Sequence, residues 1–153
     1  MSVKKVVLLG STGSIGTSTL KVAQEIPERM EIVPLAAANS VESLAQQAKE
    51  TGVKHVGIFN PAKEAELRSL IAEDVTIYVG LEGLVELAKL SGADMVLVAI
   101  VGTAGLRPAL AAIEAGKDLA VASKEILVMA GELVMRAARE KGVNVLPVDS
   151  EHN

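Results

Sequence analysis

The sequence predicts an α/β fold: a doubly wound, mostly parallel sheet of about seven strands with helices on both faces. Short apolar runs alternate with longer stretches in which apolar residues recur three and four apart, which is the pattern of strands joined by crossover helices. Half of the 153 residues are apolar but only 1% are aromatic, so Val, Leu, Ile and Ala must form the core. The alternation covers the whole chain without a repeat or a low-complexity tract, which predicts one domain over 1–153.

Each apolar run predicts one strand. In chain order, the predicted strands are residues 5–9, 31–36, 54–59, 75–79, 95–100, 119–122 and 143–148. Pro34 lies inside the second run, and a proline within a sheet usually marks an edge, a bulge or the start of a strand.

Helical spacing fills the intervals between these strands. The first predicted helix begins near Ser14, and the others cover 41–50, 62–72, 84–90, 106–115 and 126–140. Gly116 and Gly142 follow two of these stretches, where the C-terminus of a helix favours a residue with positive φ, so we expect the helices to end there.

Composition excludes several classes of partner. A formal charge of −4 and a pI near 5.2 give no electrostatic reason to expect nucleic acid or an anionic membrane. The chain has no cysteine, hence no disulfide and no thiolate metal site, as is common in a reducing compartment. No signal-peptide pattern opens the sequence and no apolar run approaches the ~20 residues that span a bilayer, so we expect a soluble, cytoplasmic protein.

Three glycines spaced three apart, in GSTGSIG at 10–16, stand between the first strand and the first helix. At this position Gly10 permits a tight turn, Gly13 the close approach of a pyrophosphate, and Gly16 close contact of helix against strand. The hydroxyls of Ser11, Thr12 and Ser14 add possible hydrogen bonds. The pattern predicts a Rossmann-like dinucleotide site, although its spacing differs from the commoner G-x-G-x-x-G, and a tight turn without a ligand is the alternative.

The end of the second strand reads Ala38-Asn39-Ser40 and contains neither an acid nor a base. An acidic residue here would bind the ribose diol of NAD and repel the 2′-phosphate of NADP, so its absence permits NADP. Asn39 and Ser40 either contact the cofactor or cap the following helix. Farther on, AIVG at 99–102 offers small residues along which a nicotinamide can lie, or simply a tight turn.

Two polar clusters follow late strands. Ser123-Lys124-Glu125 follows an apolar run. Lys124 is either a residue of the site or a solvated lysine beside an ordinary N-cap.

In the segment 149–152, an extended chain would place Asp149 and Glu151 on the same side. A hard cation such as Mg²⁺ or Mn²⁺ would neutralise the two carboxylates, and the alternative is a solvated acidic tail. His152 is a ligand, a substrate contact or neither, and His55 is expected to be structural.

The motifs GSTGSIG at 10–16, AIVG at 99–102, SKE at 123–125 and LPVDSEHN at 146–153 resemble, in the same order, the amino-terminal part of the 1-deoxy-D-xylulose 5-phosphate reductoisomerase family. The resemblance implies an enzyme that rearranges this phosphosugar and reduces the product with NADPH to 2-C-methyl-D-erythritol 4-phosphate, on the non-mevalonate route to isoprenoids. It also implies a divalent metal, Mg²⁺ or Mn²⁺, and a full-length homodimer.

The resemblance further implies roles for individual residues. The cofactor-binding residues would be Gly10, Thr12, Gly13, Ser14, Ile15, Ala38, Asn39, Ser40, Ser123 and Glu125. Lys124, Ser150 and Glu151 would contact the substrate, with Lys124 and Glu151 catalytic, and Asp149 and Glu151 would hold the metal. Many members carry a basic residue where this chain has Asn39.

Members of this family continue beyond the DSEHN motif with a catalytic domain and a helical domain. We therefore expect this chain to be a truncated part that binds the dinucleotide without turning over. Two other interpretations are the cofactor domain of another two-domain dehydrogenase, for example one acting on a semialdehyde, and a stand-alone nucleotide-binding module.

Overall fold

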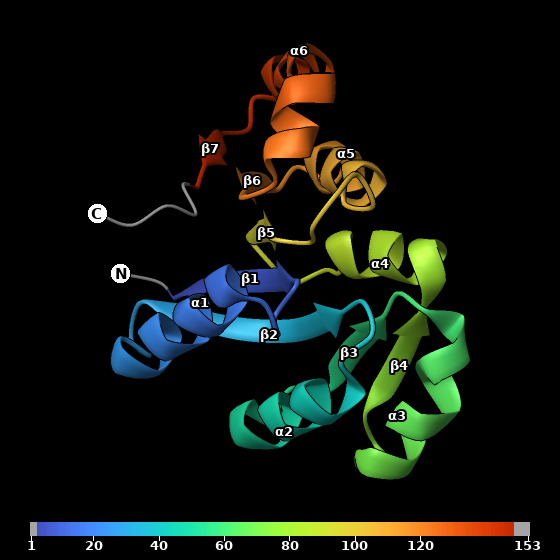
Figure 1. Cartoon of the computed structure of the whole chain (residues 1–153). Coiled ribbons are helices and arrows are strands. Elements are labelled where there is room, and N and C mark those ends of the chain that lie inside the picture. Colours follow the sequence, from blue (N-terminus) through green and yellow to red (C-terminus); the bar gives the residue numbers. More distant parts are fainter. Residues whose placement is uncertain (1–2, 149–153) are drawn as a thin grey trace.

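A parallel sheet forms the centre of the molecule, of which the computed structural model describes residues 3–148 (Figure 1). The seven strands are β1 Lys4–Leu9, β2 Met30–Ala37, β3 His55–Ile58, β4 Thr76–Val79, β5 Met95–Val98, β6 Asp118–Val121 and β7 Val145–Pro147. Their order across the sheet is β4-β3-β2-β1-β5-β6-β7, and every neighbouring pair is parallel. The predicted doubly wound sheet is therefore confirmed.

Helices connect successive strands of this sheet. They are α1 Ser14–Glu25, α2 Val41–Thr51, the 3₁₀ turn η1 Pro61–Lys63, α3 Glu64–Leu70, α4 Gly80–Ala88, α5 Leu106–Glu114 and α6 Lys124–Lys141. As predicted, Gly116 and Gly142 adopt positive φ just after α5 and α6. None of the helices in the described part of the chain is long and apolar enough to cross a membrane.

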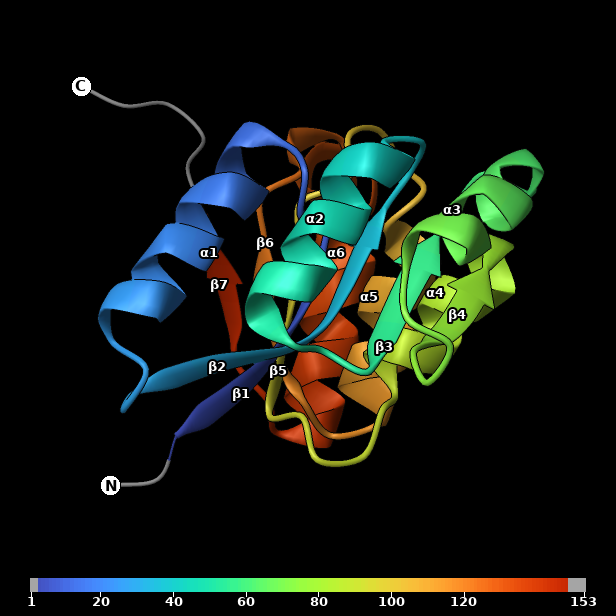
Figure 2. The same cartoon turned by 90° about the horizontal axis from the view of Figure 1, so that it is seen from below.

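The two faces of the sheet carry different helices. Figure 2 shows α1, α2 and α3 in front of the sheet and α4, α5 and α6 behind it. Along β1, Val6 and Leu8 pack with the first group, whereas Val7 and Leu9 pack with the second. Since successive side chains of a strand point to opposite faces, a continuous apolar strand supplies both cores at once.

Pro34 lies inside β2, between β1 and β3, and the sheet accommodates it with a bulge. Val6 pairs with Ile32 but Leu8 pairs with Leu35, so β2 carries one residue more than β1 over this interval. A proline has no amide proton for a ladder, and a bulge removes the need for one. The predicted strand is confirmed, and the proline marks its irregularity.

Some predicted helix bounds are wrong. The helix predicted over 84–90 is α4, which begins four residues earlier at Gly80, and the single helix predicted over 62–72 is η1 followed by α3. Gly80 and Gly83 obscured the start of α4 because glycine is a poor helix former. Gly83 is nevertheless required, since a Cβ there would lie 2.7 Å from the backbone of Tyr78.

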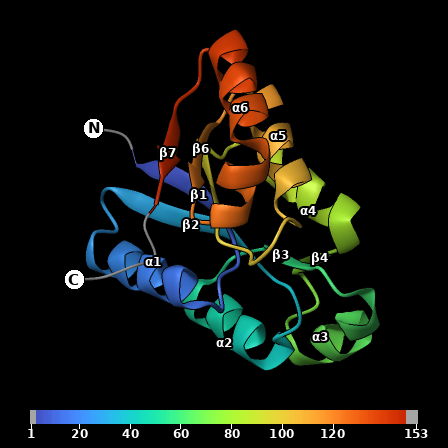
Figure 3. The same ribbon diagram turned by 45° about the horizontal axis from the view of Figure 1, so that its top comes forward.

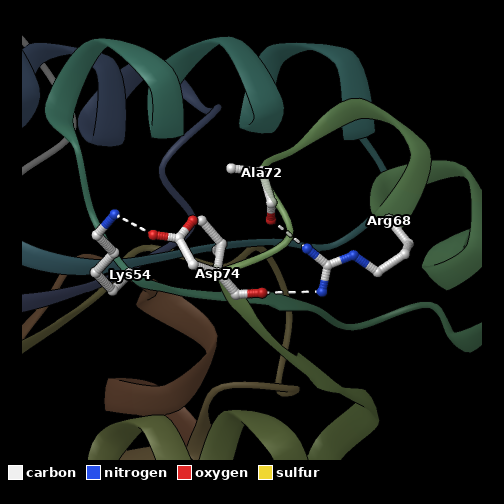
Figure 4. A network of polar contacts seen from close by, with 5 residues as sticks. Lys54, Arg68, Ala72 and Asp74 are labelled. Carbon is white, nitrogen blue, oxygen red and sulfur yellow. Dashed lines mark hydrogen bonds and ion pairs between the residues drawn. The ribbon is translucent and has the colours of Figure 1, made fainter.

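Polar contacts brace the amino-terminal end of β3 and β4 (Figure 4). The Lys54 ammonium lies 2.6 Å from the carboxylate of Asp74 and holds the pKa of that group below its usual 3.8. The guanidinium of Arg68, on α3, donates to the backbone oxygens of Ala72 and Val75. Because the ion pair is solvent-exposed, its contribution to stability is small.

Lys117, just before β6, is buried, and its burial makes the free energy of unfolding depend on pH. Its side chain is 7% exposed, its Nζ donates to the Ala93 carbonyl at 2.7 Å, and burial lowers its pKa from 10.5. Below the folded-state pKa the buried charge costs stability, and this cost disappears as the pH rises towards 10.5. We therefore expect the free energy of unfolding to rise with pH in this alkaline window, relative to Lys117→Met. Denaturant titrations of both proteins test this, and a constant difference between them across the window would contradict it.

Candidate cofactor-binding site

The carboxyl ends of the parallel strands meet at one edge of the sheet, where most of the predicted site residues lie. The chain crosses from β4 to β5, so the direction of winding reverses between the adjacent strands β1 and β5. The amides of Gly10, Ala99 and Ala122 donate to neighbouring strands at 2.7 to 2.8 Å, which continues the ladder beyond the strand ends. In doubly wound sheets, ligands bind at this switch point.

Gly10 and Gly16 are required by the protein's own packing. Gly10 has φ +101°, and a Cβ on it would lie 2.6 Å from the backbone of Ala99. A Cβ on Gly16 would lie 2.2 Å from the carbonyl oxygen of Gly10 and 2.6 Å from the Cα of Ser11. The predicted tight turn at Gly10 is therefore confirmed, and Gly16 brings α1 against the loop itself.

Gly13 differs from both. It is the N-cap residue of α1 with φ −80°, which any residue adopts, and a Cβ there would meet only the Gly10 oxygen, at 3.9 Å. No side chain caps α1, and its first turn contains no acidic residue. The amide groups at the start of a helix attract anions, so the open space over Gly13 fits a phosphate group.

Ser11 anchors this loop to α2. It is fully buried, its hydroxyl donates to Oε1 of Gln47 at 2.7 Å, and Nε2 of Gln47 donates back to the Ser11 carbonyl at 2.9 Å. Its hydroxyl is thus occupied within the protein rather than directed at a phosphate. No sequence pattern indicates Gln47, which lies 36 residues away along the chain. Of the other predicted residues, Thr12 and Ile15 are half-buried, and Ser14 is exposed.

At the end of β2, Asn39 is held by a residue that sequence reasoning missed. The amide of Asn60 donates from Nδ2 to Oδ1 of Asn39 at 2.8 Å, and its backbone N–H donates to the carbonyl of Ala38 at 3.0 Å. Ser40 occupies the N-cap position of α2, but its side chain makes no capping hydrogen bond.

Ser123 is the N-cap of α6, as one of the two interpretations predicted. Its Oγ accepts from the amide of Ile126 at 3.3 Å and lies 3.0 Å from the Gly102 carbonyl and 3.3 Å from Oε1 of Glu125. The hydroxyl has one proton and can donate it to either oxygen, and the shorter distance favours the Gly102 carbonyl. Ser123 thereby joins α6 to the loop after β5, which Figure 3 shows beside the start of α6.

Lys124 and the loop after β5 complete the described part of this edge. Lys124 is exposed and is the first residue of α6, where its charge and the helix dipole both attract anions. The strand predicted to reach Ile100 ends at Val98, so AIVG forms a loop. In this loop Ile100 is buried and Val101 is 87% exposed, which leaves an apolar surface at the edge.

The metal and substrate residues predicted at the end of the chain, Asp149, Ser150 and Glu151, lie outside the described residues, as does His152. The backbone amide of Val148 donates to the carbonyl of Val121 at 2.8 Å. The chain therefore leaves β7 at the carboxyl edge of the sheet, where the other site residues lie. Within residues 3–148, no group of three or more His, Asp or Glu side chains could hold a metal ion.

A hollow of about 340 Å³ lies away from this site, at the amino-terminal end of the strands. Lys5, Lys54 and His55 are among its lining residues. Nδ1 of His55 lies 3.0 Å from the hydroxyl of Tyr78, and burial together with the charge of Glu86 raises the pKa of that tyrosine. This pairing supports the structural role predicted for His55.

Comparison with known proteins gives a consistent result. The family model described as 1-deoxy-D-xylulose 5-phosphate reductoisomerase matches residues 6–131. Reductoisomerases of Thermoanaerobacter sp. (strain X514) and Protochlamydia amoebophila are 48% and 44% identical to the chain over 150 residues, which is 98% of this chain and 39% of each relative. The chain thus spans about two fifths of the length of these curated relatives.

Solved structures agree with these matches. The Zymomonas mobilis reductoisomerase in complex with NADPH superposes with a TM-score of 0.89 at 44% identity, covering 98% of this chain and 40% of that one. A reductoisomerase complex with NADPH, fosmidomycin and magnesium gives 0.90 at 40% identity, covering 97% and 37%. The biliverdin reductase of Synechocystis, with a TM-score of 0.66 at 19% identity and coverage of 94% and 37%, shares the fold alone.

Proposed function

Since the chain belongs to the 1-deoxy-D-xylulose 5-phosphate reductoisomerase family, we propose that it is the NADPH-binding part of an enzyme of this activity. The complete enzyme rearranges 1-deoxy-D-xylulose 5-phosphate and reduces the product to 2-C-methyl-D-erythritol 4-phosphate. The chain contains the dinucleotide fold and the first polar clusters of the site, in accordance with its share of the relatives' length.

The open space over Gly13 is the observation that carries this proposal. Gly10 and Gly16 are required by internal packing, whereas nothing in the described structure requires a glycine at position 13. A bare backbone beside the uncapped start of α1 fits the pyrophosphate of a dinucleotide. Thr12, Ser14 and Ile15 flank Gly13 in the chain and would complete the cradle.

The other proposed cofactor contacts are those that the family resemblance implies. Ala38, Asn39 and Ser40, at the end of β2, would lie beside the adenosine ribose and its 2′-phosphate. Glu125 and the backbone of Ser123 would contact the cofactor from α6. When bound, NADPH supplies the hydride for the reduction.

Lys124 would contact the substrate, because its ammonium and the helix start attract negative charge, and it would stabilise charge that develops on a substrate oxygen. Asp149 and Glu151 would hold Mg²⁺ or Mn²⁺, and Ser150 and Glu151 would contact the substrate. Support for this metal site comes from carboxylate chemistry and from related reductoisomerase structures in complex with magnesium. A homodimeric full-length enzyme and a cytoplasmic location remain predictions.

We expect the 153-residue chain to bind NADPH without catalysing turnover. Calorimetric titration should give one NADPH bound per chain, while incubation with NADPH, 1-deoxy-D-xylulose 5-phosphate and Mn²⁺ should leave the NADPH absorbance constant. The full-length Thermoanaerobacter relative provides the positive control for activity. Absence of NADPH binding would contradict the proposed cofactor site, and sustained NADPH oxidation would contradict the predicted inactivity.

A further inference from the structure

We propose that Asn60 is a positioning residue that determines which end of the Asn39 amide is presented to the cofactor, and thereby favours NADPH over NADH. The inference rests on the proposed function and adds to it a specificity element that lies in a different loop from Asn39. Asn60 follows β3, whereas Asn39 follows β2.

Asn60 is held in one orientation by three hydrogen bonds. Its Oδ1 accepts from the backbone amide of Ala62 at 3.0 Å, which caps η1. Its Nδ2 donates to Oδ1 of Asn39 at 2.8 Å, and its own backbone amide donates to the Ala38 carbonyl at 3.0 Å. It therefore joins two residues of the proposed ribose site to the start of the 3₁₀ turn.

The chemistry of these partners determines which atom donates and which accepts in each of these hydrogen bonds. A backbone N–H can only donate, so the atom of Asn60 that faces Ala62 must be its oxygen. The NH₂ group of Asn60 then faces Asn39, and two NH₂ groups cannot bond to each other, so Asn39 must offer its oxygen. The Nδ2 group is consequently the part of the Asn39 amide that is left for a ligand.

An N–H donor at this position distinguishes NADPH from NADH. The 2′-phosphate of NADPH carries only acceptor oxygens towards such a group, and an N–H donor satisfies them. The 2′-hydroxyl of NADH is typically recognised by an acceptor, the carboxylate that ends the second strand in NAD-dependent folds. This chain has no carboxylate there, and the Asn60 bond turns the amide oxygen of Asn39 towards Asn60.

Asn60→Asp tests the inference because it reverses the polarity with almost no change in shape. One carboxylate oxygen still accepts from the Ala62 amide, but the other can also only accept. Asn39 must therefore turn its NH₂ group towards position 60 and present its oxygen to the cofactor. We expect the ratio of NADPH to NADH affinity, measured by calorimetry, to fall by roughly tenfold or more.

The added negative charge also weakens NADPH binding, and a double-mutant cycle separates this effect. In an Asn39→Ala background the charge change is the same but no amide can turn, so the affinity ratio should fall by less than about threefold. Asn39→Asp is the second test, because its carboxylate can accept from Asn60 and still present an acceptor oxygen, and it should lower the ratio as Asn60→Asp does.

The outcomes separate this inference from the proposed function. Binding of neither nucleotide by the unmodified chain would overturn the proposed function and the inference with it. Normal NADPH binding, with an equal fall of the ratio on Asn60→Asp in both backgrounds, would overturn the role of Asn60 alone. Circular dichroism of each variant verifies that the fold is retained.

Discussion

Gly16→Ala is expected to destabilise the chain by about 3 kcal/mol or more, at the upper end of the cost of overpacking. The new Cβ would lie 2.2 Å from the Gly10 oxygen and 2.6 and 2.7 Å from the Cα and carbonyl carbon of Ser11. All three are backbone atoms, and Ser11 is fixed by its two bonds to Gln47. Relief of the clash would require α1 to move away from the switch point. Because domains are stable by only about 5–15 kcal/mol, a substantial fraction of the molecules should unfold at moderate denaturant concentration.

Denaturant unfolding followed by circular dichroism measures this effect. Gly131→Ala is the matched control, since Gly131 lies in α6 just after the kink at Ala130 and a Cβ there would meet nothing within 4 Å. Because the added methyl group has room and alanine is a better helix former than glycine, the control should retain the stability of the unmodified chain. Equal stability of the two variants would show that α1 is not held against the loop as described.

Gly13→Ala is expected to separate binding from folding. The nearest heavy atom to its Cβ would be the Gly10 oxygen at 3.9 Å, an ordinary contact, so the protein itself accommodates the methyl group. Alanine is a poorer N-cap than glycine, which costs under about 1 kcal/mol. The same methyl group occupies the space proposed for the pyrophosphate, so NADPH affinity should fall by roughly tenfold or more.

Calorimetric titration with NADPH and thermal unfolding measure the two effects on one preparation. Gly13→Ser serves as the control for folding, because serine is a strong N-cap and places a Cβ at the same position. Its stability should equal or exceed that of the unmodified chain while its NADPH binding is weakened. Unchanged NADPH affinity in both variants would show that the cofactor does not approach Gly13, and the proposed site would then be wrong.

The strands were predictable because each needs only a local signal. Six of the seven predicted strands begin within one residue of the observed start, and β7 begins two residues later than predicted. In a sheet covered on both faces, most residues of the inner strands face one core or the other, so an apolar run marks the strand directly. Helix starts were less accurate where glycine stood inside the helix, as at Gly80 and Gly83 of α4.

The position of the site could be predicted from the sequence, but the set of predicted residues was incomplete. The glycine loop, the end of β2 and the start of α6 lie at one edge because parallel strands place their carboxyl ends together. Gln47 and Asn60 were missed, since each acts through a hydrogen bond to a residue 36 or 21 positions away. Neither residue belongs to a motif. Asn60 precedes Pro61, which is typical of a junction between elements, but nothing in the sequence indicates its contact with Asn39.

By itself, the sequence determined that this chain forms a parallel α/β sheet with a glycine loop after its first strand, because apolar periodicity and glycine placement are properties of short segments. Only the tertiary structure decided which glycine serves packing and which leaves space for a ligand, and which end of the Asn39 amide is available. Those outcomes depend on distances between segments that strand order, register and the bulge at Pro34 bring together, and no short segment carries that information.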